Sequence, residues 1–209
     1  MRKKNSIKSL FLDIGGVLLT DGWTPEYRAS AASKFNINPV EMENRHQLAF
    51  HTYEEGKLLL DEYLQHVVFY KHRPFSESQF KIFMFSRSKA YPQMIDLIRG
   101  LKRKYELKII AVSNEGRELN AYRIRKFKLD EFVDSFISSC YVHIRKPDVE
   151  IFRIALDTSQ SPPNKVIYIE NTPMFVQIAK DLGIKSILHT DYKSTCLKLA
   201  SFGLEPIND

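Results

Sequence analysis

From residue 108 onward, short apolar runs alternate with stretches that have the spacing of amphipathic helices. Short apolar runs bounded by polar turn residues are typical of buried strands. Alternation of such runs with helices predicts a parallel sheet whose strands are joined by helical crossovers. We expect strands at 108–112, 136–139, 166–169 and 184–188, and helices at 117–128, 148–156 and 173–182.

The N-terminal part of the chain adds one more strand signal. Ser9–Leu12 is a short apolar run that leads into Asp13 and then into the pair Gly15-Gly16. This pattern is typical of a buried strand that ends in a glycine loop. A charged residue placed directly after such a strand is a candidate functional residue.

Between this first strand and residue 100, the sequence changes character. No clear strand pattern occurs there, and residues 41–50 and 61–70 carry apolar residues three and four positions apart, as amphipathic helices do. We therefore predict an α/β fold with an inserted α-helical domain. The core would comprise residues 1–20 and 100–209, and the insert residues 21–99.

Composition excludes several classes of protein. Hydrophobic residues make up 44% and charged residues 27% of the 209 positions, which argues against general disorder. The formal net charge is +6, but the basic residues are spread along the chain. We interpret them as solvated helix faces and expect no nucleic-acid partner, although a positive field weakly favours an anionic substrate.

The cellular location is predicted from two further observations. Leu10 to Leu19 follows basic residues and superficially resembles a secretory signal, but Asp13 lies inside that run. No stretch approaches the ~18 apolar residues that a membrane span needs. Two cysteines, Cys140 and Cys196, cannot form a disulfide framework or a cysteine-rich zinc site. We expect a cytoplasmic protein with no membrane partner.

Polar side chains follow several of the predicted strands. Ligands of open parallel sheets bind at the carboxyl ends of the strands, and the residues expected there are Asp13, Ser113, Asn114, Glu170 and Asn171, with Lys146 just before a helix start. A carboxylate can attack phosphorus and form an acyl phosphate. A hydroxyl and a lysine can hold the other phosphate oxygens, and a second carboxylate can help to hold Mg²⁺. The set suits phosphoryl transfer.

Four segments, in order along nearly the whole chain, resemble the motifs of the haloacid dehalogenase-like hydrolase superfamily: Phe11–Leu18, Val112–Asn114, Arg145–Asp148 and Ile167–Asn171. The resemblance implies a Rossmann-like core with a small helical cap inserted after the first motif. It also implies that Asp13 is a nucleophile, that Ser113 binds the phosphoryl group, and that Lys146 stabilises both. The fourth segment would supply metal ligands.

The sequence departs from the superfamily's pattern at two places. Gly15 stands where phosphatases usually carry a second aspartate, which acts as general acid and base. The Gly15 carbonyl can still bind Mg²⁺, but the proton-transferring side chain is missing. Because general acid–base catalysis contributes about 10²–10⁴-fold, we predict slow turnover that favours good leaving groups. Glu170-Asn171 replaces the usual two aspartates and keeps one carboxylate.

We therefore predict Mg²⁺-dependent hydrolysis of a small phosphorylated metabolite, a phosphate monoester, through an aspartyl phosphate. Asp13 and Lys146 would be catalytic, Ser113 and Asn114 would bind substrate, and the metal ligands would be Asp13, Gly15, Glu170 and Asn171. Two alternatives stay open. One is a 2-haloacid dehalogenase, which also lacks the second aspartate. The other is a catalytically weak binding or regulatory member. Glu54 and Glu55 are interpreted as part of a solvated helix face.

Overall fold

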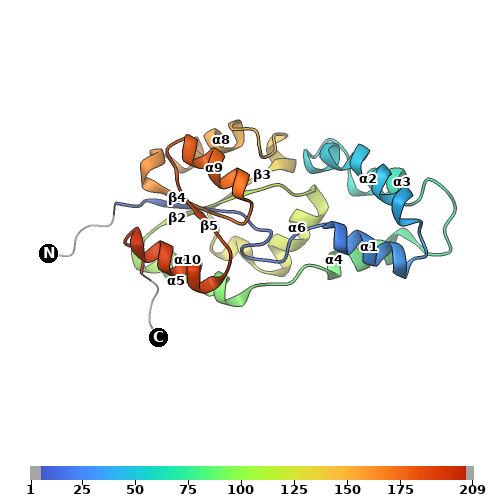
Figure 1. Ribbon diagram of the computed structural model, residues 1–209, viewed down its shortest axis with the longest axis horizontal. Coiled ribbons are helices and arrows are strands. Elements are labelled where there is room, and N and C mark those ends of the chain that lie inside the picture. The colour runs from blue at the N-terminus through green and yellow to red at the C-terminus, as the bar shows by residue number, and fades with distance from the viewer. Residues whose placement is uncertain (1–5, 206–209) are drawn as a thin grey trace.

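The computed structural model describes residues 6–205, so the basic residues Arg2, Lys3 and Lys4 lie outside the described part. Within it, the core is a five-stranded sheet in the order β3-β2-β1-β4-β5 (Figure 1). All four strand pairings are parallel, which confirms the predicted α/β fold. The strands are β1 (Ser9–Leu12), β2 (Lys108–Ser113), β3 (Ser135–Ser138), β4 (Val166–Glu170) and β5 (Lys185–Leu188).

Helices cover both faces of this sheet. Figure 1 shows α8 (Glu150–Ser159) and α9 (Pro173–Asp181) on one face, and α5 (Pro92–Tyr105) and α10 (Tyr192–Ser201) on the other. The other core helices are α6 (Arg117–Lys126), the short α7 (Ser139–Val142), and the 3₁₀ turns η1 (Leu129–Glu131) and η2 (Pro163–Lys165).

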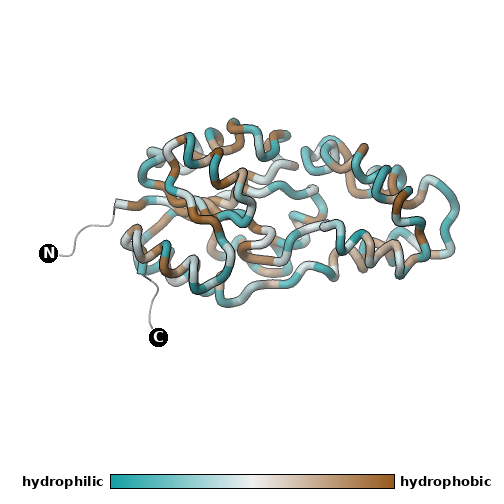
Figure 2. The backbone as a smooth tube through the Cα atoms, viewed as in Figure 1, coloured by the Kyte–Doolittle hydropathy of each residue, from teal (hydrophilic) through white to brown (hydrophobic). Residues whose placement is uncertain are grey.

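Alternate residues of each strand serve the two faces. Leu10 and Leu12 belong to the hydrophobic cluster that includes α5, whereas Phe11 belongs to the cluster that includes α8 and α9. Since both faces are covered, the strands need continuous apolar runs, and Figure 2 shows hydrophobic residues along them. This explains why the strands could be recognised in the sequence.

Four helices form a separate unit at one end of the sheet, which we call the helical insert (residues 21–89) (Figure 1). They are α1 (Pro25–Lys34), α2 (Pro39–Glu54), α3 (Leu60–Val67) and α4 (Glu77–Ser86). The side chains of Thr24 and Asn38 cap the first two of them, in each case just before a proline, as helix starts favour. The four helices pack around their own hydrophobic cluster.

The chain enters and leaves the helical insert through two adjacent segments. The Thr20 N–H donates to the Lys89 carbonyl, and the Tyr91 N–H donates to the Leu18 carbonyl, both at 2.8 Å. Helix α5 then packs in the cluster that contains Leu10. The predicted boundary at residue 99 is therefore wrong, because the apolar face of α5 covers the sheet and the insert ends before this helix.

Helix lengths bear on one further expectation. Among residues 6–205, we find no helix with both the length and the apolar character that crossing a bilayer requires.

Candidate active site

The predicted convergence of polar side chains occurs at the carboxyl edge of the sheet. Asp13 follows β1, which lies between β2 and β4, and its N–H donates to the Ile169 carbonyl at 3.0 Å. Ser113 ends β2 and Glu170 ends β4. Asp13, Gly15, Ser113 and Asn114 line one cavity of about 200 Å³. Their shared location follows from parallel strands whose ends meet at one edge.

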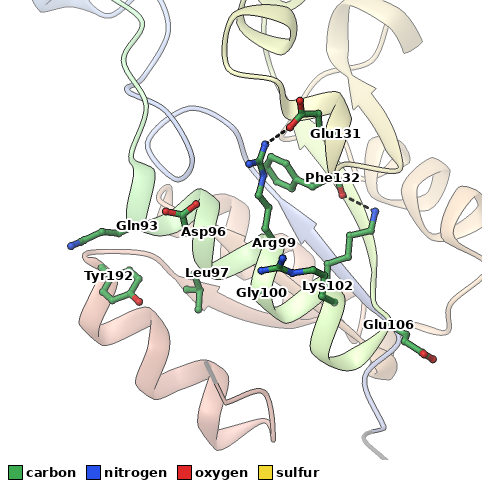
Figure 3. Close-up of a pocket in the computed structure, with 11 residues that line it drawn as sticks. Gln93, Asp96, Leu97, Arg99, Gly100, Lys102, Glu106, Glu131, Phe132 and Tyr192 are labelled. Carbon is green, nitrogen blue, oxygen red and sulfur yellow. Dashed lines mark hydrogen bonds and ion pairs between the residues drawn. The ribbon is translucent and has the colours of Figure 1, made fainter. Parts of the chain in front are cut away.

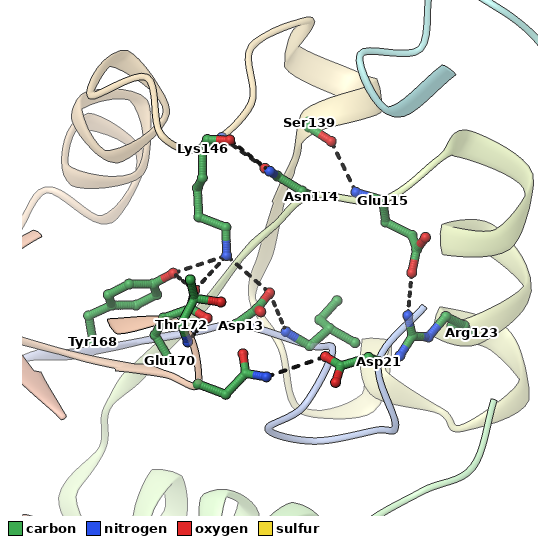
Figure 4. Close-up of polar contacts among 12 residues, drawn as sticks. Asp13, Asp21, Asn114, Glu115, Arg123, Ser139, Lys146, Tyr168, Glu170 and Thr172 are labelled. Atoms are coloured by element: carbon green, nitrogen blue, oxygen red, sulfur yellow. Dashed lines mark hydrogen bonds and ion pairs between the residues drawn. The ribbon is translucent and has the colours of Figure 1, made fainter. Parts of the chain in front are cut away.

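Lys146 lies at the centre of a buried charge network (Figure 4). Its Nζ atom is 3.2 Å from Asp13 Oδ1 and 2.7 Å from Glu170 Oε2, and it donates to the Tyr168 hydroxyl at 3.1 Å. The lysine side chain is only 1% exposed. A buried ammonium group is stable only when paired and hydrogen-bonded, and here two carboxylates and a phenol satisfy it.

The network shifts the pKa values of its two carboxyl groups in opposite directions. Burial, together with the nearby Glu170 charge, raises the pKa of Asp13 to about 7, against the smaller effects of Lys146 and Ser113. Burial also acts to raise the pKa of Glu170, but the Lys146 ammonium and the Tyr168 hydroxyl outweigh it and hold that pKa below its ordinary value. The ammonium group also lies nearer to Glu170, at 2.7 Å, than to Asp13, at 3.2 Å.

Glu170, predicted as a metal ligand, is fully buried. Its Oε2 accepts hydrogen bonds from Lys146 and from the Tyr168 hydroxyl, and its Oε1 accepts one from the Thr172 N–H at 2.9 Å. Three of the roughly four acceptor sites of the carboxylate are thus used by protein donors. These contacts fix the position of the Lys146 ammonium group.

Asn114 was predicted to hold the phosphoryl group, and its side chain is committed elsewhere. Its Nδ2 donates to the Lys146 carbonyl at 2.9 Å, and its Oδ1 accepts from the Lys146 N–H at 2.8 Å. The carboxamide thus ties the end of β2 to the lysine backbone and fixes where the ammonium group lies. Ser113, also predicted to bind the substrate, is 3% exposed and lines the cavity.

The helical insert supplies one wall of the same cavity. Phe50 and Glu54 from α2 line it, together with Trp23 from the loop before α1. Glu54 is buried and forms an ion pair with Arg145, at 2.7 Å. Its interpretation as a solvated residue is wrong, because the last turn of α2 packs against the core. Burial raises the pKa of Glu54 to about 7 even though Arg145 opposes the shift.

A second buried ion pair lies at this cavity and was missed in the sequence. Arg123 is 1% exposed. It forms an ion pair with Glu115 and also donates to the Thr20 carbonyl. In the sequence Arg123 lies within a strongly basic helix, so nothing distinguishes it from its solvated neighbours.

Tyr168 and Asp21 were also missed. Tyr168 precedes Glu170 by two residues in β4, so both lie on one side of the strand, and this period could have revealed the tyrosine. Asp21 lies in the loop after the first motif and lines the cavity. Its Oδ1 accepts a hydrogen bond from Asn171 Nδ2 at 3.3 Å. No motif marks it.

A larger cavity of about 860 Å³ lies elsewhere, beside α5 (Figure 3). Three of its charged side chains, Arg99, Lys102 and Glu131, already have protein partners. Arg99 pairs with Glu131 at 2.8 Å, and Lys102 donates to the Phe132 carbonyl at 2.8 Å. None of the predicted site residues lines it, so its size does not make it the site of the chemistry.

The residues at the sheet edge offer oxygen ligands of the kind that Mg²⁺ prefers. Among residues 6–205, no group of three or more acidic, histidine or cysteine side chains is arranged to hold a metal. Carbonyl and amide oxygens would therefore have to contribute. The carboxylate of Asp13 and the backbone carbonyl of Gly15 share the cavity, and Asn171 adds an amide oxygen. This donor set fits a hard cation.

Comparison with curated proteins gives two kinds of relative. The chain is 30% identical over 118 residues to "Bifunctional epoxide hydrolase 2" of Mus musculus, covering 54% of this chain and 21% of that protein. It is 29% identical over 99 residues to "Phosphorylated carbohydrates phosphatase" of Thermotoga maritima, covering 47% and 45%. The chain thus matches less than half the length of either relative.

Solved structures share the fold. A HAD family enzyme of Bacteroides thetaiotaomicron, in complex with magnesium and inorganic phosphate, superimposes with a TM-score of 0.73 at 20% identity, covering 90% of this chain and 98% of that one. An L-2-haloacid dehalogenase gives 0.60 at 17% identity, covering 86% and 82%. The family model for haloacid dehalogenase-like hydrolases matches residues 7–183. The chain therefore belongs to the haloacid dehalogenase-like hydrolase family.

Proposed function

We propose that this hydrolase cleaves small phosphate monoesters through a phosphoryl group carried on Asp13, with Mg²⁺ as cofactor. One observation carries the proposal. The Lys146 ammonium group lies within 3.2 Å of a carboxylate at the end of the central strand, beside a cavity of about 200 Å³. A nucleophile next to a fixed cation suits attack on an anionic phosphoryl group.

The contacts of Asp13 indicate which atom attacks. Its Oδ1 accepts from the Ile14 N–H at 2.9 Å and from Lys146, which leaves Oδ2 to attack phosphorus. Lys146 and the Ser113 hydroxyl would hold the other oxygens of the transferring group. Water then attacks the aspartyl phosphate and releases inorganic phosphate. Bound Mg²⁺, held by Asp13, the Gly15 carbonyl and Asn171, would neutralise charge on the phosphoryl group.

The helical insert would act as the family's cap. Its residues Phe50 and Glu54 line the cavity together with Trp23, so this unit would contact the leaving group and exclude water. The small cavity favours a small phosphorylated metabolite. The names of the Thermotoga phosphatase and of the magnesium and phosphate complex support this reaction class.

Dehalogenation of a 2-haloacid is a second candidate. Gly15 places no acidic side chain in the cavity, and displacement of halide needs no leaving-group acid. Release of chloride from 2-chloropropionate without metal, with no phosphatase activity, would favour this alternative.

The direct test is phosphate release from p-nitrophenyl phosphate and from a panel of sugar and nucleotide phosphates. Wild type, Asp13→Asn and Asp96→Asn would be assayed with Mg²⁺ and with EDTA. Asp96 is an exposed residue of α5 and serves as the matched control. We expect activity that EDTA and Asp13→Asn abolish and Asp96→Asn preserves. Activity equal to the Asp13→Asn background on every ester would refute the proposal and leave dehalogenation or binding without turnover.

A further inference from the structure

Hydrolysis of a phosphate monoester needs a proton for the departing alcohol, because an alkoxide leaves poorly. Four carboxyl groups line the cavity: Asp13, Asp21, Glu54 and Glu115. Asp13 attacks phosphorus in the proposed reaction, and Glu54 and Glu115 form ion pairs with arginines. Within the described part of the chain, Asp21 is the lining carboxylate for which no ion pair is found.

The position of Asp21 is set by the loop that follows the nucleophile. A β-carbon added to Gly15 would lie 3.4 Å from Asp21 Oδ1, in ordinary van der Waals contact. The Asp21 carboxylate therefore borders the space that a side chain on Gly15 would enter, two residues after Asp13. Asn171 Nδ2 donates to Oδ1 at 3.3 Å (Figure 4). Asp21 is exposed to solvent, and this bond leaves its Oδ2 for another partner.

We propose that Asp21 is the general acid and base of this hydrolase, acting where Gly15 has no side chain. This inference rests on the proposed function. In the first half-reaction Asp13 Oδ2 bonds to phosphorus, the bond from phosphorus to the ester oxygen breaks, and the Asp21 carboxyl proton passes to that oxygen. In the second, the Asp21 carboxylate takes a proton from water, whose oxygen bonds to phosphorus. The aspartyl–phosphorus bond breaks, which restores the Asp13 carboxylate and the protonated Asp21.

The two halves of this role have different kinetic signatures. The acid matters for alkyl esters and hardly at all for p-nitrophenyl phosphate, whose leaving group departs without a proton. The base matters for both, because both pass through the same aspartyl phosphate. Wild type should therefore depend only weakly on leaving-group pKa, in contrast to the slow, leaving-group-sensitive turnover predicted from Gly15 alone.

The experiment compares wild type with Asp21→Asn on glycerol phosphate and p-nitrophenyl phosphate, and Asp96→Asn is the control. For the variant we expect kcat/KM to fall about 10²–10³-fold on glycerol phosphate and less than tenfold on p-nitrophenyl phosphate. On the aryl ester, kcat should fall and a burst of nitrophenol should appear, because the aspartyl phosphate accumulates. A residue with a merely structural role would produce no burst.

A second variant restores the carboxyl group from the other side of the same space. Gly15→Asp in the Asp21→Asn background should recover at least tenfold in kcat/KM on glycerol phosphate, since Gly15 has room for a β-carbon. Thermal unfolding of each variant checks that the fold is kept.

The other outcomes test the role of Asp21 and the proposed phosphatase function separately. Equal losses on the two esters, or no loss on either, would overturn the role of Asp21. If Asp13→Asn still abolished activity in that case, the phosphatase proposal would survive alone. If wild type showed no phosphatase activity that requires both Mg²⁺ and Asp13, both proposals would be overturned.

Discussion

The two sides of the candidate active-site cavity are built in different ways. On the core side, Asp13 follows β1, Tyr168 and Glu170 lie in β4, and Lys146 lies in the loop between α7 and α8. Each of these polar groups bonds to the next. On the insert side, the wall comes from helix packing. There Tyr53 and Tyr63 stack with ring centroids 5.0 Å apart. Sheet geometry therefore sets the positions of the polar groups, whereas aromatic packing between distant segments forms the opposite wall of the cavity.

The hydroxyl group of Tyr63 links several ring side chains on the insert side. The Tyr63 hydroxyl accepts from Trp23 Nε1 at 3.1 Å and lies 2.8 Å from His46 Nδ1. Buried aromatic residues contribute large contact areas, and their polar atoms need partners. The wall is thus held by contacts within the helical insert, with few charged links to the sheet. We expect substitutions on the two sides to differ in kind as well as in size.

The largest effect should come from removing the central cation on the core side. Lys146→Met leaves the buried carboxylates of Asp13 and Glu170 unpaired, and breaking a buried pair in this way costs about 3–5 kcal/mol of unfolding free energy. The proposed phosphatase activity should be lost as well. Urea denaturation measures the stability change. The control is Lys102→Met, which removes a half-exposed pair with Asp134 and should cost at most about 1 kcal/mol. Similar losses in both variants would contradict the core-side network.

The next effect tests the packing of the insert against the core. A β-carbon on Gly116 would lie 2.0 Å from Cζ of the fully buried Tyr53. Gly116→Ala should therefore destabilise the protein by about 1–3 kcal/mol through overpacking. Gly15→Ala meets nothing nearer than 3.4 Å and should stay within about 0.5 kcal/mol of wild type. Thermal unfolding of both variants would show whether the contact between insert and core is as tight as described.

The pH dependence of stability tests a carboxyl group of the insert side, that of Glu54. The pKa of Glu54 is raised from 4.5 to about 7, first by burial. Between these values the folded state binds more protons than the unfolded state, so the contribution of Glu54 to stability is present below pH 4.5 and is lost as pH rises to about 7. The unfolding free energy of wild type minus that of Glu54→Gln should fall as pH rises over this window, by about 1–3 kcal/mol. A difference that is constant with pH would show that burial does not raise the pKa of Glu54.

The smallest effect sharpens the core side. Tyr168→Phe removes the hydroxyl that donates to Glu170 and accepts from Lys146, but leaves the ion pairs intact. Loss of such a hydrogen bond typically costs about 0.5–1.5 kcal/mol. We expect a loss of that size in urea denaturation with a modest decrease in activity. A loss as large as that of Lys146→Met would mean that the phenol, rather than the carboxylates, holds the lysine.

What the sequence could predict follows the same division. Asp13, Ser113 and Glu170 were placed correctly at one edge because parallel strands end together, and apolar runs mark those strands. The extent of the insert was misjudged, since α5 carries no strand signal and its apolar face could not be assigned to a partner. Glu54 and Arg145 meet across 91 positions of the chain. No local pattern encodes such a contact, and the same holds for Asp21.

The central place of β1 governs when the site can exist at all during synthesis. This N-terminal strand pairs with β2 on one side and β4 on the other, so its partners are made long after it. At a translation rate of about 5–20 residues per second, the Ser9–Leu12 segment waits roughly ten seconds or more for its second neighbour. A ribosome-bound chain that stops before β4 therefore carries Asp13 on a strand that can pair only with β2, without Glu170 or Tyr168. The buried network around Lys146 therefore cannot be complete until β4 has emerged.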